Sequence, residues 1–143
     1  MKTTIDPSSA IRAAFEKFVP LAMHGLSKMV IPEGDLFCFR ATAGSESNLI
    51  LDGRSERYSA MSLIGLACQQ RLGNPADFDT TAIADRLHLW APTAPDLGDT
   101  SLVLWAEILR GEDRAEQTAA ALLARKAEVF APKYALASME TGF

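Results

Sequence analysis

The chain has 143 residues, a length typical of one domain, and we expect residues 1–143 to form a single helical domain. Apolar residues make up 48% of the chain and charged residues 22%, a balance typical of folded rather than disordered proteins. The net charge of −4 argues against a nucleic-acid partner, because phosphate binding requires clustered positive charge.

The first expected element is a helix that begins after the polar capping residues 6–9. Pro20 lacks a backbone donor, so we expect a kink or a break within residues 18–21. The helical pattern resumes through Val30 and stops at the turn-forming residues 32–35. Apolar residues recur along this segment at helical spacing and predict one buried face: Ile11, Ala14, Phe15, Phe18, Leu21 and Ala22.

A small β-hairpin is expected within residues 36–51. Residues 36–42 are rich in aromatic side chains and show no helical period. Residues 43–48 are typical of a turn, and residues 49–51 of a short return strand. Because an isolated hairpin is marginally stable in water, we expect this one to be an attachment to a helical body.

Three later segments are poor in charge and apolar on nearly every side, a pattern typical of buried helices. They are residues 57–72, residues 102–109 and a shorter run that begins at Tyr134. Trp105 lies within the second of these segments, so we expect its indole to be buried.

Two amphipathic segments separate the apolar ones. The first is capped at residues 79–81 and carries an apolar stripe that ends at Trp90, which we expect to be at least partly buried. The second runs over residues 113–130. This alternation, with a period of about 38 residues, predicts a mainly α protein built as an array of αα-hairpins, in which outer helices screen inner ones. An ordinary helical bundle with two central helices is the alternative.

Two stretches resemble the starts of inner helices in bacterial α/α-toroid proteins: residues 53–66 (GRSERYSAMSLIGL) and residues 97–106 (LGDTSLVLWA). This superfamily includes the terpenoid-cyclase and prenyltransferase-like toroids and the six-hairpin glycosidases. The resemblance covers most of the chain and implies a partial α/α toroid, because a full ring contains more hairpins than this chain supplies. It implies that the chain is the N-terminal portion of a larger toroid, and that self-association or missing C-terminal chain covers its open flank.

Candidate ligand-binding residues lie at the starts of the apolar helices or on them. In such an array the inner helices run parallel, so their N-terminal ends, with free backbone N–H groups, meet at one mouth. Asp99 precedes a helix and is expected mainly as an N-cap. Glu107 lies among apolar residues and needs a partner, for which we consider Arg57. The full set of candidates is Arg54, Glu56, Arg57, Tyr58, Asp99, Trp105, Glu107 and Tyr134.

The sequence predicts no catalytic set, metal site or cofactor. The histidines and cysteines, His24, His88, Cys38 and Cys68, do not have the spacing of zinc ligands. We find neither a glycine-rich phosphate loop nor a nucleophile elbow. Whether the chain is an enzyme stays open; because no catalytic set is complete, we expect no activity for this chain alone.

The chain shows features of a cytoplasmic protein. Its first residues lack the apolar core of a signal peptide. The longest uncharged run, residues 58–70, is too short to cross a bilayer, so we expect no membrane partner. We expect both cysteines to be reduced, as is usual in this compartment.

Two functions remain open at this point. The first is handling of a small-molecule ligand, a sugar or an isoprenoid, at the mouth formed by the inner helices of a full-length toroid. The second is a noncatalytic protein-protein interaction module.

Overall fold

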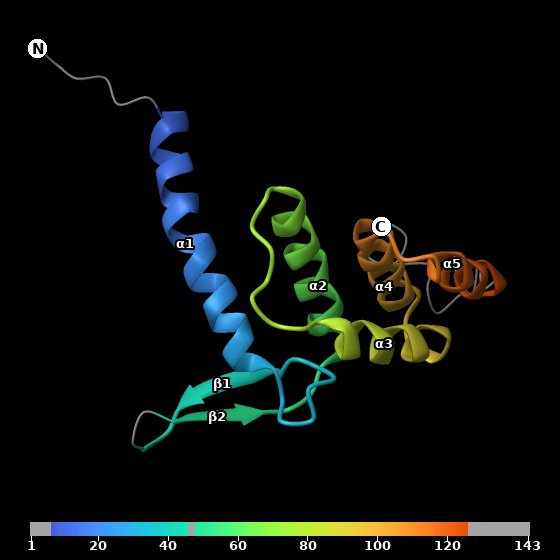
Figure 1. The fold of residues 1–143 in the computed structure, drawn as a ribbon. Helices are drawn as coiled ribbons and strands as arrows, with labels where there is room; N and C mark the ends of the chain where they lie inside the picture. The colour runs from blue at the N-terminus through green and yellow to red at the C-terminus, as the bar shows by residue number, and fades with distance from the viewer. Residues whose placement is uncertain (1–6, 46–47, 126–143) are drawn as a thin grey trace, which may run out of the picture.

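The computed structural model describes residues 7–45 and 48–125, which form five helices and one two-stranded hairpin (Figure 1). The expected class, mainly α with a small β-hairpin, is confirmed. Tyr134 and the apolar helix expected around it lie outside the described residues. The elements are α1 (Pro7–Met29), β1 (Arg40–Ala43), β2 (Leu49–Asp52), α2 (Glu56–Arg71), α3 (Thr81–Trp90), the 3-10 turn η2 (Ala91–Thr93), α4 (Leu97–Arg110) and α5 (Ala115–Ala124).

Helix α1 is continuous through Pro20, so the expected break does not occur. The predicted buried face is wrong, since Ala14 and Ala22 are exposed and the four larger residues Ile11, Phe15, Phe18 and Leu21 are each between 59% and 64% exposed. Figure 1 shows the reason, because α1 stands apart from the other helices over most of its length. Only its C-terminal part, from Met23 onward, packs against the core. The apolar period correctly indicated a helix, but the face that it predicted to be buried is exposed.

The loop at residues 31–38, between α1 and the hairpin, is the most deeply buried irregular segment that the structure describes. Leu36 is 0% exposed and Phe37 is 1% exposed. The amide of Phe37 donates to the Ser59 hydroxyl over 2.9 Å, and the amide of Cys38 donates to the Met29 carbonyl over 2.8 Å. These bonds satisfy buried backbone groups that no sheet reaches. The strand expected from residue 36 therefore begins at Arg40.

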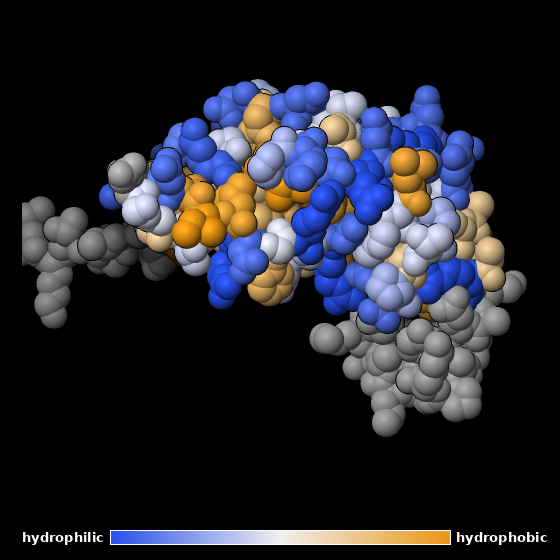
Figure 2. Space-filling model, turned by 90° about the horizontal axis from the view of Figure 1, so that it is seen from below, coloured by the Kyte–Doolittle hydropathy of each residue, from blue (hydrophilic) through white to orange (hydrophobic). Residues whose placement is uncertain are grey.

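The hairpin is exposed on the surface, as expected of an attachment to a helical body. Strands β1 and β2 pair antiparallel, with Arg40 opposite Asp52 and Ala43 opposite Leu49. Figure 2 shows apolar side chains gathered over the hairpin and mostly polar side chains over α3. Leu49 and Ile50 are among the large apolar residues exposed on the hairpin.

Helices α2 and α4 lie side by side and run parallel. At their N-terminal ends the Arg57 guanidinium binds the Asp99 carboxylate, with 2.5 Å between Nε and Oδ1. At their C-terminal ends Arg71 donates from Nε to the Leu109 carbonyl over 3.0 Å. The parallel order expected for inner helices is therefore present between these two.

Helices α3 and α5 run opposite to α4. Near the start of α3, the Thr80 hydroxyl accepts from Arg110 at the C-terminal end of α4, over 2.8 Å. At the other end, the Thr100 hydroxyl of α4 donates to the Ala91 carbonyl over 3.0 Å. Arg125, which follows α5, donates to the Ala94 carbonyl over 2.7 Å, so α5 returns toward the start of α4. Of the residues 79–81 expected to cap α3, Asp79 accepts from the amide of Thr81 over 2.8 Å, whereas Thr80, at the N-cap position, makes no side-chain capping bond.

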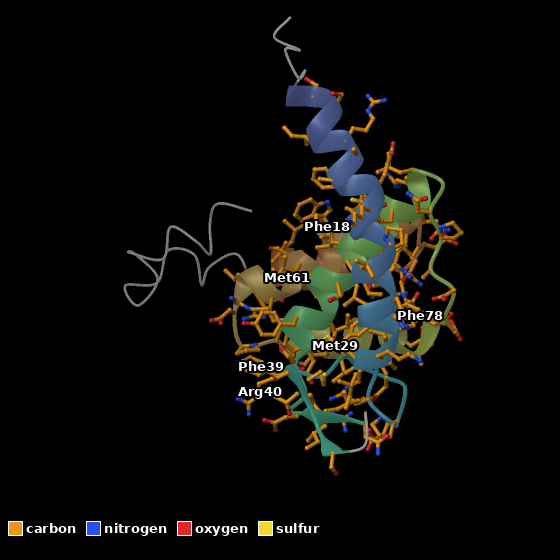
Figure 3. The ribbon with its side chains drawn as sticks, turned by 90° about the vertical axis from the view of Figure 1, so that its left-hand side faces the viewer. Phe18, Met29, Phe39, Arg40, Met61 and Phe78 are labelled. Carbon is orange, nitrogen blue, oxygen red and sulfur yellow. The ribbon has the colours of Figure 1, made fainter. Side chains whose placement is uncertain are left out.

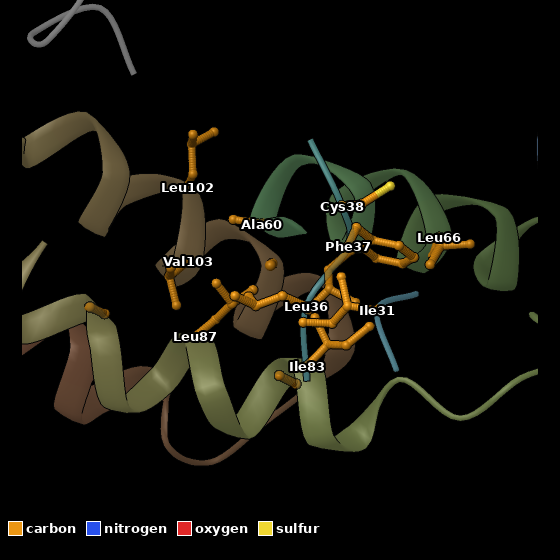
Figure 4. Packing of buried hydrophobic residues seen from close by; sticks show 14 residues of the cluster. Ile31, Leu36, Phe37, Cys38, Ala60, Leu66, Ile83, Leu87, Leu102 and Val103 are labelled. Atoms are coloured by element: carbon orange, nitrogen blue, oxygen red, sulfur yellow. The ribbon is translucent and has the colours of Figure 1, made fainter. Parts of the chain in front are cut away.

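The core lies between α2, α3, α4 and the 31–38 loop (Figure 4). Leu36 and Ile31 of the loop reach toward Ile83 and Leu87 of α3, as Figure 4 shows. Close packing of these side chains, rather than the hairpin, joins the N-terminal part of the chain to the helices. The buried apolar residues of this cluster are Ile31, Leu36, Phe37, Cys38, Ala60, Leu63, Leu66, Ile83, Ala84, Leu87, Ala91, Leu102, Val103 and Ala106.

The prediction that Trp105 is buried is wrong, since its residue is 46% exposed. Trp90 is half-buried, as expected. Helix α4 is covered by α2, α3 and α5, but the side that carries Trp105 is open to solvent. Helix α2 likewise has one side open to solvent. Met61 of α2 and Ile108 of α4, with exposed fractions of 50% and 56%, also lie on open surface. The two segments that are apolar on nearly every side thus form helices that keep one side exposed to solvent.

Candidate functional site

The N-terminal ends of α2 and α4 bring together several of the predicted ligand-binding residues. The Asp99 side chain is 5% exposed and the Arg57 side chain is 43% exposed. A second carboxylate, that of Asp96, lies 3.6 Å from the same guanidinium. Arg57 thus binds two carboxylates at once, which joins the two helices where their N-terminal ends meet.

Asp99 is not an N-cap, which corrects the expectation from its place in the sequence. Helix α4 begins at Leu97, so Asp99 lies inside the first turn, and Asp96 takes the cap position without a capping side-chain bond. A carboxylate in the first turn is still favourable, because the N-terminal end of a helix carries partial positive charge.

The other charged candidates at this end are also paired. The Glu56 carboxylate accepts from Arg86 of α3 over 3.3 Å. Arg54 donates to both carboxylate oxygens of Asp35, at 2.9 Å and 3.1 Å. These pairs bind the 31–38 loop and α3 to the start of α2 and the segment just before it.

Tyr58 is directed to the hairpin rather than to the ion pairs. Its ring lies 5.3 Å from the ring of Phe39, centroid to centroid, and its residue is 45% exposed. The predicted mouth is therefore a set of ion pairs beside an aromatic pair. Such an arrangement can hold elements together, and its charged groups already bind one another.

Glu107 belongs to a different, buried polar centre between α3, α4 and α5. Its residue is 2% exposed, and Oε1 lies 2.9 Å from Nδ1 of His88. The Thr118 hydroxyl of α5 lies 3.4 Å from the same ring nitrogen, and Nε of Arg114 lies 3.9 Å from Oε1. Among the residues that the structure describes, Oε2 of Glu107 is buried without a hydrogen-bond partner.

The proposed pairing of Glu107 with Arg57 is wrong. Glu107 lies two turns further along α4 than Asp99, about 12 Å at the usual helical rise, and on a different side of the helix. Arg57 therefore reaches Asp99 and not Glu107. Sequence reasoning found the buried carboxylate but missed His88, because nothing in the sequence shows which helix covers that side of α4.

Next to this centre, Glu112 joins two arginines at the turn between α4 and α5. It accepts from Arg110, and its Oε2 lies 2.5 Å from Nε of Arg114. Partial burial raises the pKa of the Glu112 carboxyl, but the hydrogen bonds from both arginines outweigh it and leave that pKa below its ordinary value. Arg114 also binds Asp85 of α3 over 2.5 Å, so this network links three helices.

An apolar groove of about 680 Å³ lies between α1 and the C-terminal end of α2. Phe15, Val19 and Met23 line it from α1, and Leu72 and Pro75 line it from the other side. No sequence signal pointed to this groove, because it depends on where α1 stands relative to α2.

Neither a metal site nor a membrane-spanning segment is found within residues 7–45 and 48–125. No three histidine, cysteine, aspartate or glutamate residues among them lie close enough to share a metal ion. Within these residues, no helix is both long enough and apolar enough to cross a bilayer. Both cysteines carry free thiols, with Cys38 in the core and Cys68 on the surface.

The chain shows no significant match to a protein-family model, to a curated protein or to a solved structure.

Proposed function

We propose that this chain is a noncatalytic interaction module that binds another protein chain through an apolar surface on α1. The observation that carries the proposal is the exposure of Ile11, Phe15, Phe18 and Leu21, each between 59% and 64%. These residues belong to one 23-residue helix, so they form a contiguous surface. Contiguous apolar patches are rare on monomeric proteins and usually mark an interface.

The spacing of these residues is that of a helix that packs against another helix. Ile11 and Phe18 are seven residues apart, as are Ala14 and Leu21. These are the a and d positions of a heptad repeat, which form the contact line between paired helices. We call Ile11, Ala14, Phe18 and Leu21 the α1 stripe; Phe15 lies beside it and also lines the groove toward α2.

The charged residues support an interaction module over a ligand-handling site. The predicted mouth at the starts of α2 and α4 would bind a sugar or an isoprenoid through Arg54, Glu56, Arg57 and Asp99. Each of these residues binds an opposite charge in this chain. A ligand would have to displace those pairs, whereas a partner helix on the α1 stripe displaces only water.

We also propose that α2, α3, α4 and α5 form an arc of an α/α toroid. Support comes from the parallel course of α2 and α4 and the opposite course of α3 and α5, which is the order of inner and outer helices in such a ring. In this proposal the open side of α2 and α4, with Met61 and Trp105, is the inner side of the arc.

A photo-crosslinking experiment tests the interaction module. Benzoylphenylalanine replaces Phe18 in the chain, which is then expressed and irradiated in the cells that make it. We expect covalent adducts of higher mass from position 18. The matched control places the same residue at Leu89 of α3, which is 73% exposed but lies outside the α1 stripe. Equal yields of adduct at both positions, or no adduct at position 18, would contradict the proposal.

A further inference from the structure

We infer that the partner of the α1 stripe is α1 of a second copy of this chain, paired antiparallel about a two-fold axis. The inference rests on the proposed function and names its partner. Its arguments are the arc of α1 that remains uncovered, the sizes of the side chains along the stripe, the position of its charges and the area that the pair buries.

The first argument is that α1 uses different sides for its own body and for the stripe. Val19 and Met23 line the groove toward α2, and Met23 and Leu26 pack against the core. At 100° per residue, Phe18 and Leu21 point about 100° and 160° away from Val19 around the helix axis. The body therefore leaves the stripe open, and a second helix can lie along it without displacing α2.

Figure 3 shows Phe18 of α1 and Met61 of α2 toward the same side of the molecule, with Phe78 on the opposite side. Met61 is 50% exposed. A helix on the α1 stripe would thus approach from the side on which α2 is also open.

Side-chain size gives the second argument and sets the direction of the pair. In an antiparallel pair with Ile11 opposite Leu21 of the second copy, Ala14 lies opposite Phe18. Each large ring then faces a methyl group, and paired helices approach closely when large and small side chains alternate across the contact. A parallel pair would place Phe18 against Phe18 and Ala14 against Ala14, which gives a crowded layer beside an empty one.

Charge gives the third argument. The charged residues in the exposed half of α1 are Arg12, Glu16 and Lys17, and none of them occupies an a or d position. Pairing along the stripe therefore buries no charge, which avoids the cost of desolvating an ion.

Area gives the fourth argument. Four large side chains per copy, Phe15 included, are between 59% and 64% exposed. Side chains of this size expose roughly 1,000 Å² in total over two copies, which is about the lower limit of a specific protein interface. A pair of α1 helices reaches this limit when it covers the whole stripe together with the neighbouring Phe15 ring. A two-fold axis, which lets each copy contribute the same surface, is the commonest symmetry of soluble assemblies.

Sedimentation equilibrium of the whole chain tests the pairing. We expect a reversible dimer with twice the chain mass of 15.5 kDa. Phe18→Glu should raise the dimer dissociation constant by at least about a hundredfold, because it places a charge at the centre of the contact. Leu89→Glu, which adds the same charge to an exposed site on α3, should leave it unchanged. Circular dichroism verifies that Phe18→Glu keeps its helices, as expected for a side chain that is 61% exposed.

Disulfide trapping tests the direction of the helices. In a Cys68→Ser background, a chain with Ala14→Cys is mixed with a chain carrying Phe18→Cys, and the mixture is oxidised. We expect a cross-linked dimer from the mixture and little from either chain alone. Cross-linking of each chain alone, without more in the mixture, would show a parallel pair and overturn the inference.

The outcomes separate this inference from the proposed function. A wild-type chain that stays monomeric at several hundred micromolar overturns self-pairing. If photo-crosslinking at position 18 then gives adducts with another protein, the interaction module stands with a different partner. If it gives none, both proposals fail.

Discussion

Glu107 is a buried carboxylate whose partner lies on another helix. Its carboxylate is 2% exposed and meets His88 over 2.9 Å, so α3 and α4 share one buried polar contact. Removing one member of a buried pair leaves the other member desolvated, which usually costs more than the pair itself contributes.

We therefore expect Glu107→Ala to lower the free energy of unfolding by about 3 kcal/mol. In a double-mutant cycle with His88→Ala, the two losses should fail to add by about 1–3 kcal/mol, because each variant already breaks the shared contact. Urea denaturation at neutral pH measures all four proteins. The same truncation at the exposed Glu116 of α5 serves as control and should cost less than about 0.5 kcal/mol. Additive losses in the cycle would show that the two side chains do not interact.

Glu112 gives the fold a dependence on pH. Its pKa is lowered in the folded state by hydrogen bonds from Arg110 and Arg114, against partial burial. A carboxyl with a lowered folded-state pKa stabilises the fold above its ordinary pKa of 4.5, and that contribution is lost as the pH falls through the folded-state value.

Glu112→Gln should therefore be less stable than wild type at pH 7, and the difference should shrink as the pH falls through the lowered pKa of Glu112 in the folded state. Urea midpoints measured across this range test the expectation. Arg114→Gln removes one of the two donors. In that background, the loss of stability that Glu112→Gln causes at pH 7 should be smaller. A Glu112→Gln chain that differs from wild type equally at all pH values would exclude the ion pairs as the cause.

Trp105 shows how exposure changes an expected energy. A buried tryptophan costs about 3–5 kcal/mol when truncated to alanine, and the all-apolar sequence around it predicts that loss. Because the residue is 46% exposed, we expect Trp105→Ala to cost below about 1.5 kcal/mol. Leu63→Ala in α2, at a residue that is 1% exposed, should cost about 2–5 kcal/mol under the same conditions. Equal losses at the two positions would mean that the open side of α4 is covered in solution.

At this scale the sequence predicted that Glu107 needs a partner, but not which one. Asp99 was expected as an N-cap and Arg57 as the partner of Glu107, and both predictions are wrong. The pairs Arg57–Asp99 and His88–Glu107 depend on the rotation of each helix about its axis, which is set by packing.

Among the elements, the 31–38 loop contributes more to the core than its lack of regular structure indicates. Phe37 is 1% exposed and meets Phe78 edge to face, with 6.2 Å between ring centroids. The sequence predicted a strand here because aromatic residues favour strands. Burial against α2 and α3 overrode that preference.

We expect Phe37→Ala to lower the free energy of unfolding by about 3–5 kcal/mol, as for other core aromatic residues. Phe39→Ala, two residues later, should cost about 1 kcal/mol or less. Phe39 is 58% exposed, and its ring packs against the half-exposed ring of Tyr58. Thermal or urea denaturation of the two variants gives the comparison. A larger loss for Phe39→Ala than for Phe37→Ala would mean that the hairpin, and not the loop, secures the N-terminal part of the chain.

Helix α1 shows what periodicity can and cannot predict. The repeat of Ile11, Phe18 and Leu21 correctly indicates a helix with one apolar side. Periodicity reports only that this side avoids water, so it cannot distinguish packing within one chain from packing between two chains. Pro20 did not break the helix, since the constraint that it imposes on a helix is local.

At the scale of the whole molecule, the sequence predicted a mainly helical chain with one small β-hairpin. Helices α2 and α4 are parallel, and α3 and α5 run opposite to α4, which supports the proposed array of hairpins. Some helix ends could be read from a capping side chain or a glycine, such as Ser55 before α2 and Gly111 after α4, whereas α5 has neither. The position of α1 was not predictable, because few of its apolar residues touch the rest of the chain.

The adjacency of α2 and α4 also has a consequence for how the chain folds. Neither a segment that ends at Gly73 nor one that begins at Asn74 holds a complete core. Leu36, Phe37 and Leu63 lie in the first segment, while Ile83, Leu87 and Val103 lie in the second. A chain cut at the exposed Gly73–Asn74 bond should thus yield two pieces that are poorly ordered when separate and regain helix when mixed. Circular dichroism of the pieces, alone and combined, would show this complementation, and a piece that folds alone would reveal a smaller autonomous unit.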